Sequence, residues 1–352
     1  MSAPRVSIVI DNFNYARFLA RAIDSALAQT QPGVEVVVVD DASTDGSRAV
    51  IARYGDRVLP VLLERNRGQG AAFNAGFAAC HGEVVLFLDA DDWLYPAAAA
   101  SAAAAIGPGV AQVQFRLQMV DREGHAIDLL PAPEVTFDSG DVVPLLLARG
   151  RYENTVTSGN AFARAALEAI LPMPEEPFRI SADGYLVTVA PLEGRVVSID
   201  APLGTYVLHG DNGWSSVAGS GLPERFRRAI AHDELRYAAL RRRAATKGLT
   251  LRRRPGHHDA QHLTSRLGSL VLEPDLHPVA SDSRIGLALL GAWASRAARL
   301  PRARRAVLAA WFVALGIAPR RWAASLLSWR LVPSSRPAAL RASMARLRVL
   351  LQ

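Results

Sequence analysis

Leu86-Phe87-Leu88-Asp89-Ala90-Asp91-Asp92 is a run in which an apolar strand ends in a cluster of acidic residues. The strand-forming residues 84–88 lead directly into three carboxylates within four positions. Carboxylates this close repel one another unless a cation lies among them, and magnesium typically binds one or two protein carboxylates together with substrate phosphates. The run therefore predicts a site for a divalent metal and a nucleoside diphosphate. The alternative is an acidic loop that only water solvates.

The chain before this run alternates between predicted strands and predicted helices. Short apolar runs predict strands at residues 6–10, 36–39, 58–63 and 84–88. Apolar side chains spaced about 3.6 residues apart predict a helix over 16–30, and further helices are expected after the turn at 40–46 and over 70–79. The alternation predicts an α/β fold with a Rossmann-like, mostly parallel sheet flanked by helices.

Acidic residues follow three of these four strands. Asp11 lies near the end of the first strand, Asp40 and Asp41 lie at the end of the second, and the cluster at 89–92 follows the fourth. Ligands of such sheets bind beyond the carboxyl ends of the strands. We therefore expect these carboxylates to converge on one crevice.

The second half of the chain has a less regular pattern and ends in a region of opposite charge. Helices are expected over 96–105 and 161–170, and a strand is expected over 110–120. Residues 1–222 contain 15 Lys and Arg against 26 Asp and Glu, whereas residues 223–352 contain 25 against 7. Two different surfaces are implied, with a boundary near residue 222.

Cysteine content and hydropathy indicate the compartment. The single cysteine, Cys80, can form no disulfide within the chain, and no signal-peptide core follows Met1, so we expect a cytoplasmic protein. The apolar stretch 306–318 is too short to span a bilayer, which takes about 20 residues. It suits either a buried helix or an interfacial helix on the inner face of the membrane, where the indole rings of Trp311, Trp322 and Trp329 would serve as anchors.

Six motifs, in this order, resemble the catalytic domain of glycosyltransferase family 2, which has the GT-A architecture. They lie within residues 5–215 and read VSIVIDNFNYARFLARAIDSALAQT, EVVVVDDASTDGS, NRGQGAAFNAGF, GEVVLFLDADD, ADGYL and TYVLHGDN. The resemblance implies transfer of a sugar from a nucleoside diphosphate to an acceptor hydroxyl, with inversion at the anomeric carbon and Mn²⁺ or Mg²⁺ as cofactor. It further implies a GT-A domain over 1–222, with a nucleotide-sugar half over 1–95 and an acceptor half over 96–222. The change in charge and composition predicts a basic helical region over 223–352.

The resemblance assigns the nucleotide sugar to the first three motifs. Asp41 matches the residue that contacts the base, Asp40 supports the same loop, and Asp11 lines the pocket for base and ribose. In the third motif, glycine permits close backbone approach and a helix N-terminus can favour phosphate oxygens. The residues of this donor-side segment are Asn66, Arg67, Gly68, Gln69 and Asn74.

The metal is assigned to the fourth and sixth motifs. Asp89 and Asp91 match the family's Asp-X-Asp pair, in which Asp89 leans towards the ribose and Asp91 towards the metal. Asp92 orients the site or approaches the donor sugar. His209 matches a position where some relatives supply a further metal ligand or a diphosphate contact.

The fifth motif supplies the candidate catalytic base. Inverting transfer requires a group that removes the proton of the acceptor hydroxyl, and a carboxylate within hydrogen-bond reach can do so. Asp183 stands where the family usually shows Glu-Asp, but here Ala182 precedes it. Taken alone, Asp before Gly is favourable turn chemistry. Asn212 and Trp214 are expected on an acceptor-side loop whose closure excludes water.

Three functions compete. The first is a glycosyltransferase that assembles a surface polysaccharide, glycolipid or glycoconjugate on a saccharide, lipid-linked or other hydroxyl acceptor, with its basic region on an anionic membrane surface. The second is a non-catalytic nucleotide-sugar-binding or scaffold protein of the same fold. The third is nucleic-acid binding by the arginines, which we do not expect because no nucleic-acid motif accompanies the charge.

Overall fold

The computed structural model describes residues 5–210, 221–298 and 300–331. Within these ranges the chain forms two compact units. Of the described residues, the sheet unit comprises 5–146, 151–210 and 238–250, and the helical unit comprises 147–150, 221–237, 251–298 and 300–331. The domain boundary at residue 222 stays a prediction.

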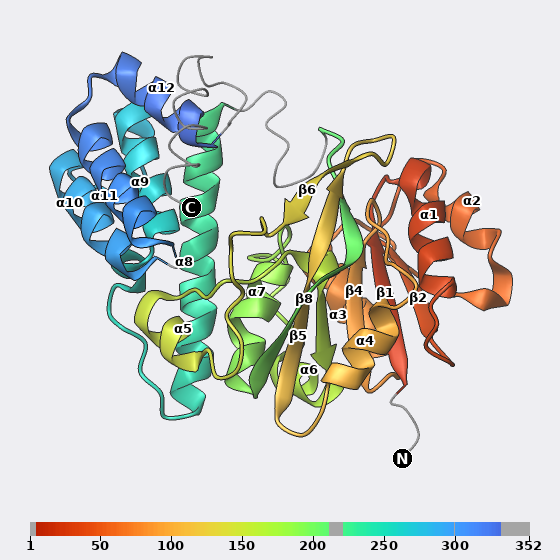
Figure 1. Cartoon of the computed structure of the whole chain (residues 1–352). Helices are drawn as coiled ribbons and strands as arrows, with labels where there is room; N and C mark the ends of the chain where they lie inside the picture. The colour runs from red at the N-terminus through yellow and green to blue at the C-terminus, as the bar shows by residue number, and fades with distance from the viewer. Residues whose placement is uncertain (1–4, 211–220, 299, 332–352) are drawn as a thin grey trace. The chain divides into compact units, whose positions relative to one another are not determined.

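The sheet unit contains a mixed, mostly parallel sheet, as predicted (Figure 1). Its strand order is β3-β2-β1-β4-β7-β5-β6, and β8 pairs with β5. The pairs β3–β2, β2–β1, β1–β4 and β5–β8 are parallel, whereas β7 and β6 run antiparallel to their neighbours. The strands are β1 (Val6–Asn12), β2 (Glu35–Asp40), β3 (Leu59–Leu62), β4 (Val84–Asp89), β5 (Val110–Val120), β6 (Ala126–Leu130), β7 (Asn160–Ala163) and β8 (Arg195–Val207).

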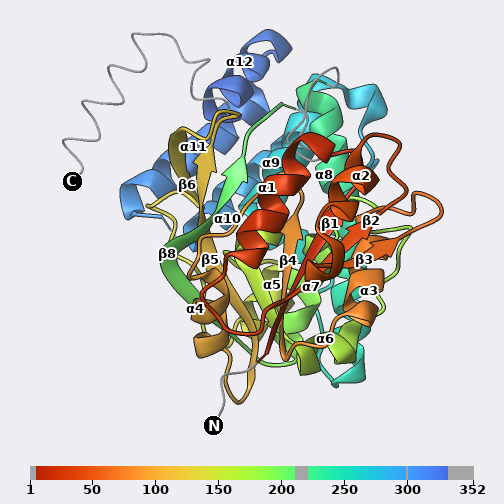
Figure 2. The ribbon, with the colours of Figure 1, turned by 90° about the vertical axis from the view of Figure 1, so that its right-hand side faces the viewer.

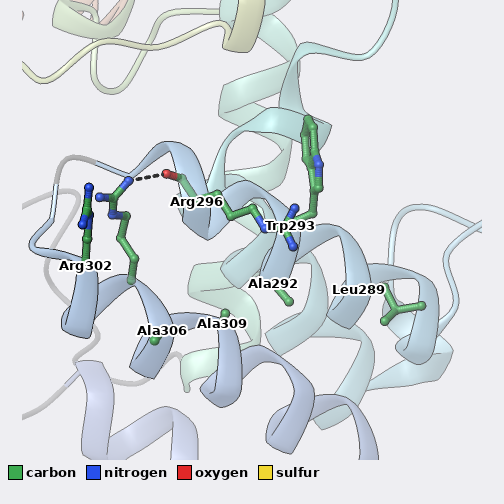
Figure 3. Close-up of a pocket in the computed structure, with 8 residues that line it drawn as sticks. Leu289, Ala292, Trp293, Arg296, Arg302, Ala306 and Ala309 are labelled. Atoms are coloured by element: carbon green, nitrogen blue, oxygen red, sulfur yellow. Dashed lines mark hydrogen bonds between the residues drawn. The ribbon is translucent and has the colours of Figure 1, made fainter.

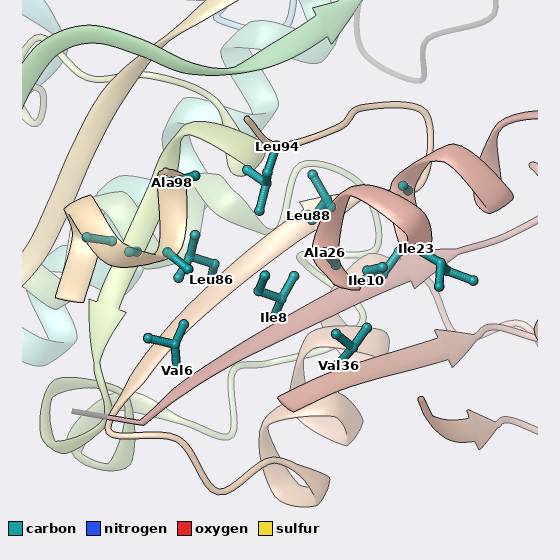
Figure 4. Close-up of a cluster of buried hydrophobic side chains, with 14 of the residues drawn as sticks. Val6, Ile8, Ile10, Ile23, Ala26, Val36, Leu86, Leu88, Leu94 and Ala98 are labelled. Carbon is teal, nitrogen blue, oxygen red and sulfur yellow. The ribbon is translucent and has the colours of Figure 1, made fainter. Parts of the chain in front are cut away.

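Both faces of β1, β2 and β4 are covered, which explains why these strands read as continuous apolar runs. On one face, Ile8 of β1 and Leu86 of β4 pack with Ile23 of α1, as Figure 4 shows. On the other face, Phe73 of α3 stacks on Phe87 of β4, with ring centroids 4.3 Å apart. The helices that follow these strands are α1 (Ala16–Leu27), α2 (Ser47–Ala52), α3 (Gln69–Ala79), α4 (Ala98–Ala105), α5 (Val143–Arg149), α6 (Arg164–Ile170) and α7 (Asp183–Val189), and Figure 2 shows α1 and α2 beside β1 and β2.

Two of the differences from the sequence prediction concern β7 and β8. The helix expected over 161–170 begins only at Arg164, because residues 160–163 form β7, which pairs with β4 on one side and β5 on the other. The long strand β8 was not predicted. It runs parallel to β5 along most of that strand, a pairing between segments more than 80 residues apart that local periodicity cannot show.

The basic C-terminal region is helical, as predicted. Helix α8 (Leu222–Thr246) is followed by α9 (Ala260–Leu272), α10 (Arg284–Ala294), α11 (Arg302–Ile317) and α12 (Arg320–Leu331). In the helical unit, apolar side chains of α9 to α12 form a core of their own that includes Leu267, Phe312 and Leu327. None of the helices described here is both long and apolar enough to cross a membrane.

Candidate active site

The ends of β1 and β4 meet at the centre of the sheet, and the end of β2, with Asp40, lies on the neighbouring strand. Strand β1 lies between β2 and β4, and Asp11 is directly opposite Asp89 in the β1–β4 register. Carboxylate oxygens of Asp89, Asp91 and Asp92 all lie within 4.8 Å of one another, a spacing that suits one metal ion. The β1–β4 register and the order of residues 89–92 therefore place these groups close together.

Mutual repulsion and burial make this cluster unfavourable as a set of free anions. Burial raises the pKa of Asp89 well above its usual value, and the charges of Asp11, Asp91, Asp92 and Asp183 raise it further. Burial and the charge of Asp91 raise the pKa of Asp11 to about 7. Oδ1 of Asp11 is buried and has no hydrogen-bond partner among the described residues. A hard divalent cation prefers oxygen ligands and would relieve this repulsion, so the residues fit a Mg²⁺ or Mn²⁺ ion.

Asp92 holds the backbone around the cluster. Its Oδ2 accepts a hydrogen bond from Oγ of Ser158 at 2.6 Å, and its Oδ1 accepts one from the backbone N–H of Val207 at 2.9 Å. Ser158 Oγ in turn accepts a hydrogen bond from the N–H of Asp89 at 3.2 Å. Asp92 thus joins the end of β4 to the end of β8, which leads to His209.

His209 lies against Asp91. Its Nε2 is 2.7 Å from Oδ2 of Asp91, and its ring is buried between those of Tyr15 and Phe18, with centroids 5.6 and 4.8 Å away. Arg122 donates a hydrogen bond from Nε to the carbonyl oxygen of His209 at 2.8 Å. The imidazole is therefore held rigidly next to the carboxylate that the sequence assigns to the metal, and its role as a ligand stays a prediction.

Asp40 and Asp41 have different surroundings although they are adjacent. Asp40 is buried and accepts hydrogen bonds from Asn12 Nδ2 at 2.9 Å and from Arg48 Nε at 2.9 Å, so it braces the turn after β2. The two oxygens of Asp41 accept hydrogen bonds from the backbone N–H groups of Arg67 at 2.8 Å and Gly68 at 2.6 Å. Asp41 therefore anchors the donor-side segment, and its predicted contact with the base is not tested by this geometry.

The first N–H groups of α3 donate hydrogen bonds within the chain. This differs from the prediction that they are open to phosphate oxygens. The N–H of Gln69 donates to the carbonyl of Arg179 at 2.9 Å, and that of Gly70 donates to the carbonyl of Phe178 at 3.0 Å. Gly68, with φ of +88°, permits a close approach, but the approach is to the backbone of Arg179. The segment around Gly68 is therefore a docking site for another part of the same chain.

Three further contacts complete this docking. Asn74 binds the backbone of Met173 with both amide atoms, at 2.9 Å each. Asn66 Oδ1 accepts a hydrogen bond from Arg179 at 2.7 Å, and Arg67 forms an ion pair with Glu175 at 2.6 Å. Contacts of Asn66, Arg67 and Asn74 with the nucleotide sugar stay predictions.

Gln69 connects the acidic cluster to the candidate base. Its Nε2 donates a hydrogen bond to Oδ1 of Asp89 at 2.9 Å, and its Oε1 accepts one from the N–H of Ala182 at 2.9 Å. Ala182 immediately precedes Asp183, which is the first residue of α7. Ser181, with φ of +58°, turns the chain sharply into that helix. Asp183 is thus a helix residue, and its charge acts on Asp89.

We expect Gly68→Ala to destabilise the sheet unit more than Gly55→Ala. Both glycines have positive φ, and Gly68, with φ of +88° and ψ of 174°, lies in a region that is essentially restricted to glycine, so its backbone cost of about 1–3 kcal/mol is at least as large as that at Gly55. A Cβ at position 68 would lie 2.7 Å from the Cα and O atoms of Arg179, whereas one at position 55 would meet nothing within 4 Å. Overpacking adds about 1–3 kcal/mol. Urea denaturation measures the difference in unfolding free energy, and equal losses for the two variants would contradict this close contact.

Sequence reasoning missed the residues that hold the site together. Ser158, Phe178 and Arg179 act through hydrogen bonds to segments far away in the sequence, and no local motif marks them. Asn212 and Trp214, expected on the acceptor-side loop, lie outside the described residues.

Comparison with known proteins identifies the family of this chain. The family model described as glycosyl transferase family 2 matches residues 7–131, a range that contains all three acidic strand ends. An uncharacterized glycosyltransferase of Nostoc sp. is 38% identical over 61% of this chain and 68% of its own length. The succinoglycan biosynthesis protein ExoO of Rhizobium meliloti is 31% identical over 86% of both chains.

Among solved structures, TarS of S. aureus (residues 1–349, in complex with UDP-GlcNAc) covers 88% of this chain and 90% of its own, with 19% identity and a TM-score of 0.49. A likeness this distant supports no inference about ligands. The sequence relatives are closer, and the mostly parallel sheet with acidic strand ends is the GT-A fold that the motifs predicted. With 31% identity to ExoO along nearly the whole of both chains, this chain belongs to glycosyltransferase family 2 and is a glycosyltransferase.

Proposed function

We propose that this glycosyltransferase is an inverting, metal-dependent enzyme that takes its sugar from a nucleoside diphosphate. The observation that carries the proposal is the convergence of Asp11, Asp89, Asp91, Asp92 and Asp183, whose charges act on one another in a buried site. Such a site is costly without a cation and suits a ligand that brings one. We take residues 1–222 as the catalytic domain.

The residues of the cluster divide into binding and holding groups. Asp91 and Asp89 would bind the metal, with Nε2 of His209 beside Asp91 as a third candidate. A bound Mn²⁺ or Mg²⁺ ion would neutralise charge on the departing diphosphate. Asp92 keeps the ends of β4 and β8 together through its two hydrogen bonds. Asp11 and Asp41 would line the nucleotide pocket.

Asp183 would act as the base. Its carboxylate takes the proton of the acceptor hydroxyl while the acceptor oxygen attacks the anomeric carbon and the bond to the diphosphate oxygen breaks. Gln69 positions this group, because the same side chain binds Asp89 and the N–H of Ala182. Gln69 would thereby fix the distance between the donor site at Asp89 and the base Asp183. A fixed distance favours attack of the acceptor oxygen on the anomeric carbon from one direction.

The acceptor we propose is a growing surface polysaccharide or its lipid-linked precursor. The support is the similarity to ExoO, a succinoglycan biosynthesis protein, over 86% of both chains. A cytoplasmic enzyme at the inner face of the membrane would meet such a precursor there.

A panel of nucleotide sugars tests this function. Purified full-length protein is mixed with UDP-, GDP- and dTDP-sugars, with and without Mn²⁺ or Mg²⁺, and thermal stability and nucleotide release are recorded. We expect one donor to raise the melting temperature only when metal is present, since binding at 100 times Kd stabilises by about 2.7 kcal/mol. A donor that binds and releases no nucleotide with any acceptor would favour a binding or scaffold protein instead. No response to any donor would refute the proposal.

A further inference from the structure

Two helices of the helical unit, α10 and α11, expose apolar side chains where the outer face of a helix is ordinarily polar. On α10, Ile285, Leu289 and Trp293 recur every four residues, and Leu289 is 61% and Trp293 49% exposed. On α11, Val313 and Ile317 are four residues apart, and Ile317 is 69% exposed. Positions this far apart share one helix face, so each helix carries an apolar stripe that faces solvent.

The two helices pack closely against each other. Gly291 of α10 lies against the ring of Phe312 in α11, and Gly316 of α11 lies against Ala288 of α10, each in a space that a Cβ would fill. The start of α10 is therefore next to the end of α11, and the short turn between them joins the other two ends. Both stripes belong to one continuous helical hairpin.

A cleft of about 620 Å³ opens between the helices at the end where they are joined. Figure 3 shows small side chains, Ala292, Ala306 and Ala309, between the helices, with Arg302 at one end of the cleft and Leu289 at the other. Its polar lining consists of three arginines, and the lining includes no acidic side chain. The lining residues are Leu289, Ala292, Trp293, Arg296, Arg302, Arg305, Ala306 and Ala309.

The surrounding sequence has no anion to neutralise these arginines. Asp282 is the last acidic residue of the chain, and residues 284–352 contain 13 arginines and no Asp, Glu or Lys. Arg305 donates a hydrogen bond from Nη1 to the backbone carbonyl of Arg296 at 2.8 Å, a neutral acceptor, and it forms no ion pair with the residues that the structure describes. The cleft is therefore complementary to a ligand with negative charge.

We propose that this α10–α11 surface binds a bilayer that contains anionic phospholipids. Arg296, Arg302 and Arg305 would contact headgroup phosphates, which a guanidinium group binds in a bidentate manner. The exposed stripes, with Leu289 and Trp293 at the cleft, would enter the boundary between headgroups and acyl chains, where indole rings are favoured. This property goes beyond the transfer reaction and does not depend on which donor or acceptor the enzyme uses.

Charge disfavours two other occupants of the surface. A second copy of the chain would bring the same arginines against one another. The C-terminal residues 332–352 of the chain itself carry four arginines and no acidic residue, so the arginines of the cleft would repel them as well. A nucleic acid would match the arginines, but its phosphate backbone has no partner for the exposed side chains of Leu289 and Ile317.

Sedimentation with vesicles tests the proposal on the full-length protein. The probes are vesicles of phosphatidylcholine alone and vesicles with about 30% phosphatidylglycerol, at an ionic strength of about 150 mM. We expect binding only to the anionic vesicles. A variant with Arg296→Gln, Arg302→Gln and Arg305→Gln should bind them about 100-fold more weakly, since each arginine near the surface contributes about fivefold.

The matched control removes three charges from exposed positions elsewhere, with Arg53→Gln, Arg241→Gln and Arg253→Gln. This control should keep most of its affinity for the anionic vesicles. Both triple variants should still bind the nucleotide sugar, which shows that they are folded. Equal losses for the two triple variants would overturn the proposal, because the effect would then follow net charge. Equal binding of the unmodified protein to neutral vesicles would also overturn it.

Two further arms separate the lipid surface from other sources of phosphate. Leu289→Ser with Ile317→Ser retains every arginine, and we expect it to lose the part of vesicle binding that persists at high salt. Unchanged binding by this variant would refute contact of the stripes with acyl chains. Inorganic phosphate or duplex DNA is added to the anionic vesicles at an equal concentration of phosphate groups. Displacement of the protein from the vesicles would assign the cleft to a free anion or a nucleic acid and would refute the proposal of membrane binding.

Discussion

Asp183→Asn is expected to lower kcat for sugar transfer by about 100- to 10,000-fold, the usual contribution of a general base. The amide cannot accept the proton of the acceptor hydroxyl, while its size is unchanged and Gln69 still binds Asp89 and Ala182. The affinity for the nucleotide sugar should therefore stay within about twofold of the original. Steady-state kinetics together with donor binding by calorimetry measure both quantities.

Asp56→Asn is the matched control for this change, because it removes the same charge from an exposed turn of the sheet unit. It should leave kcat unchanged. If Asp183→Asn retains kcat within about tenfold of the original, another group is the base. Loss of donor binding together with kcat would instead indicate that Asp183 acts on the donor.

Asp91→Asn is expected to lower kcat by about 100- to 1,000-fold, as removal of one electrostatic stabiliser of the transition state commonly does. The substitution removes one of the three carboxylates that could hold a metal ion, and it leaves those of Asp89 and Asp92 in place. Oδ1 of the asparagine can still accept a hydrogen bond from His209, so the packing of the imidazole should persist. Kinetics over a range of Mn²⁺ concentrations separate a weaker metal affinity from a slower reaction.

Stability gives a second measurement for the same variant. Without metal, Asp91→Asn should unfold at the same temperature as the original protein or higher, because Asp91 raises the pKa of both Asp11 and Asp89 by repulsion. With Mn²⁺ the original protein should gain stability and the variant should gain much less. A variant that Mn²⁺ stabilises as strongly as the original would remove Asp91 from the metal site.

Local sequence was sufficient to predict the nucleotide half of the fold. Strands β1, β2 and β4 are buried on both faces, so the apolar run of each is continuous, and its acidic end follows directly in the chain. Because parallel strands share one carboxyl edge, the positions of Asp11, Asp41 and Asp89 followed from the order of the motifs. The motifs also predicted the family, which the likeness to ExoO confirms.

The acceptor half was harder to predict because its elements depend on distant partners. Residues 160–163 have a helix-compatible composition, but they become a strand since β4 and β5 both offer them hydrogen bonds. The N–H groups at the start of α3, which the sequence predicted to be open to phosphate oxygens, are bonded within the chain for a similar reason. They meet the carbonyls of Phe178 and Arg179, more than 100 residues further along.

Periodicity and charge order along the chain were enough to establish a parallel sheet, its acidic edge and a separate basic helical region, since each depends on residues that are neighbours in sequence. The attachment of Asp183 to the acidic cluster through Gln69, and the outward apolar stripes of α10 and α11, depended on folding. Such contacts join segments that are far apart in the sequence, and no local pattern marks which segments will meet. Which backbone groups find partners and which helix faces stay exposed is therefore decided only when the chain packs.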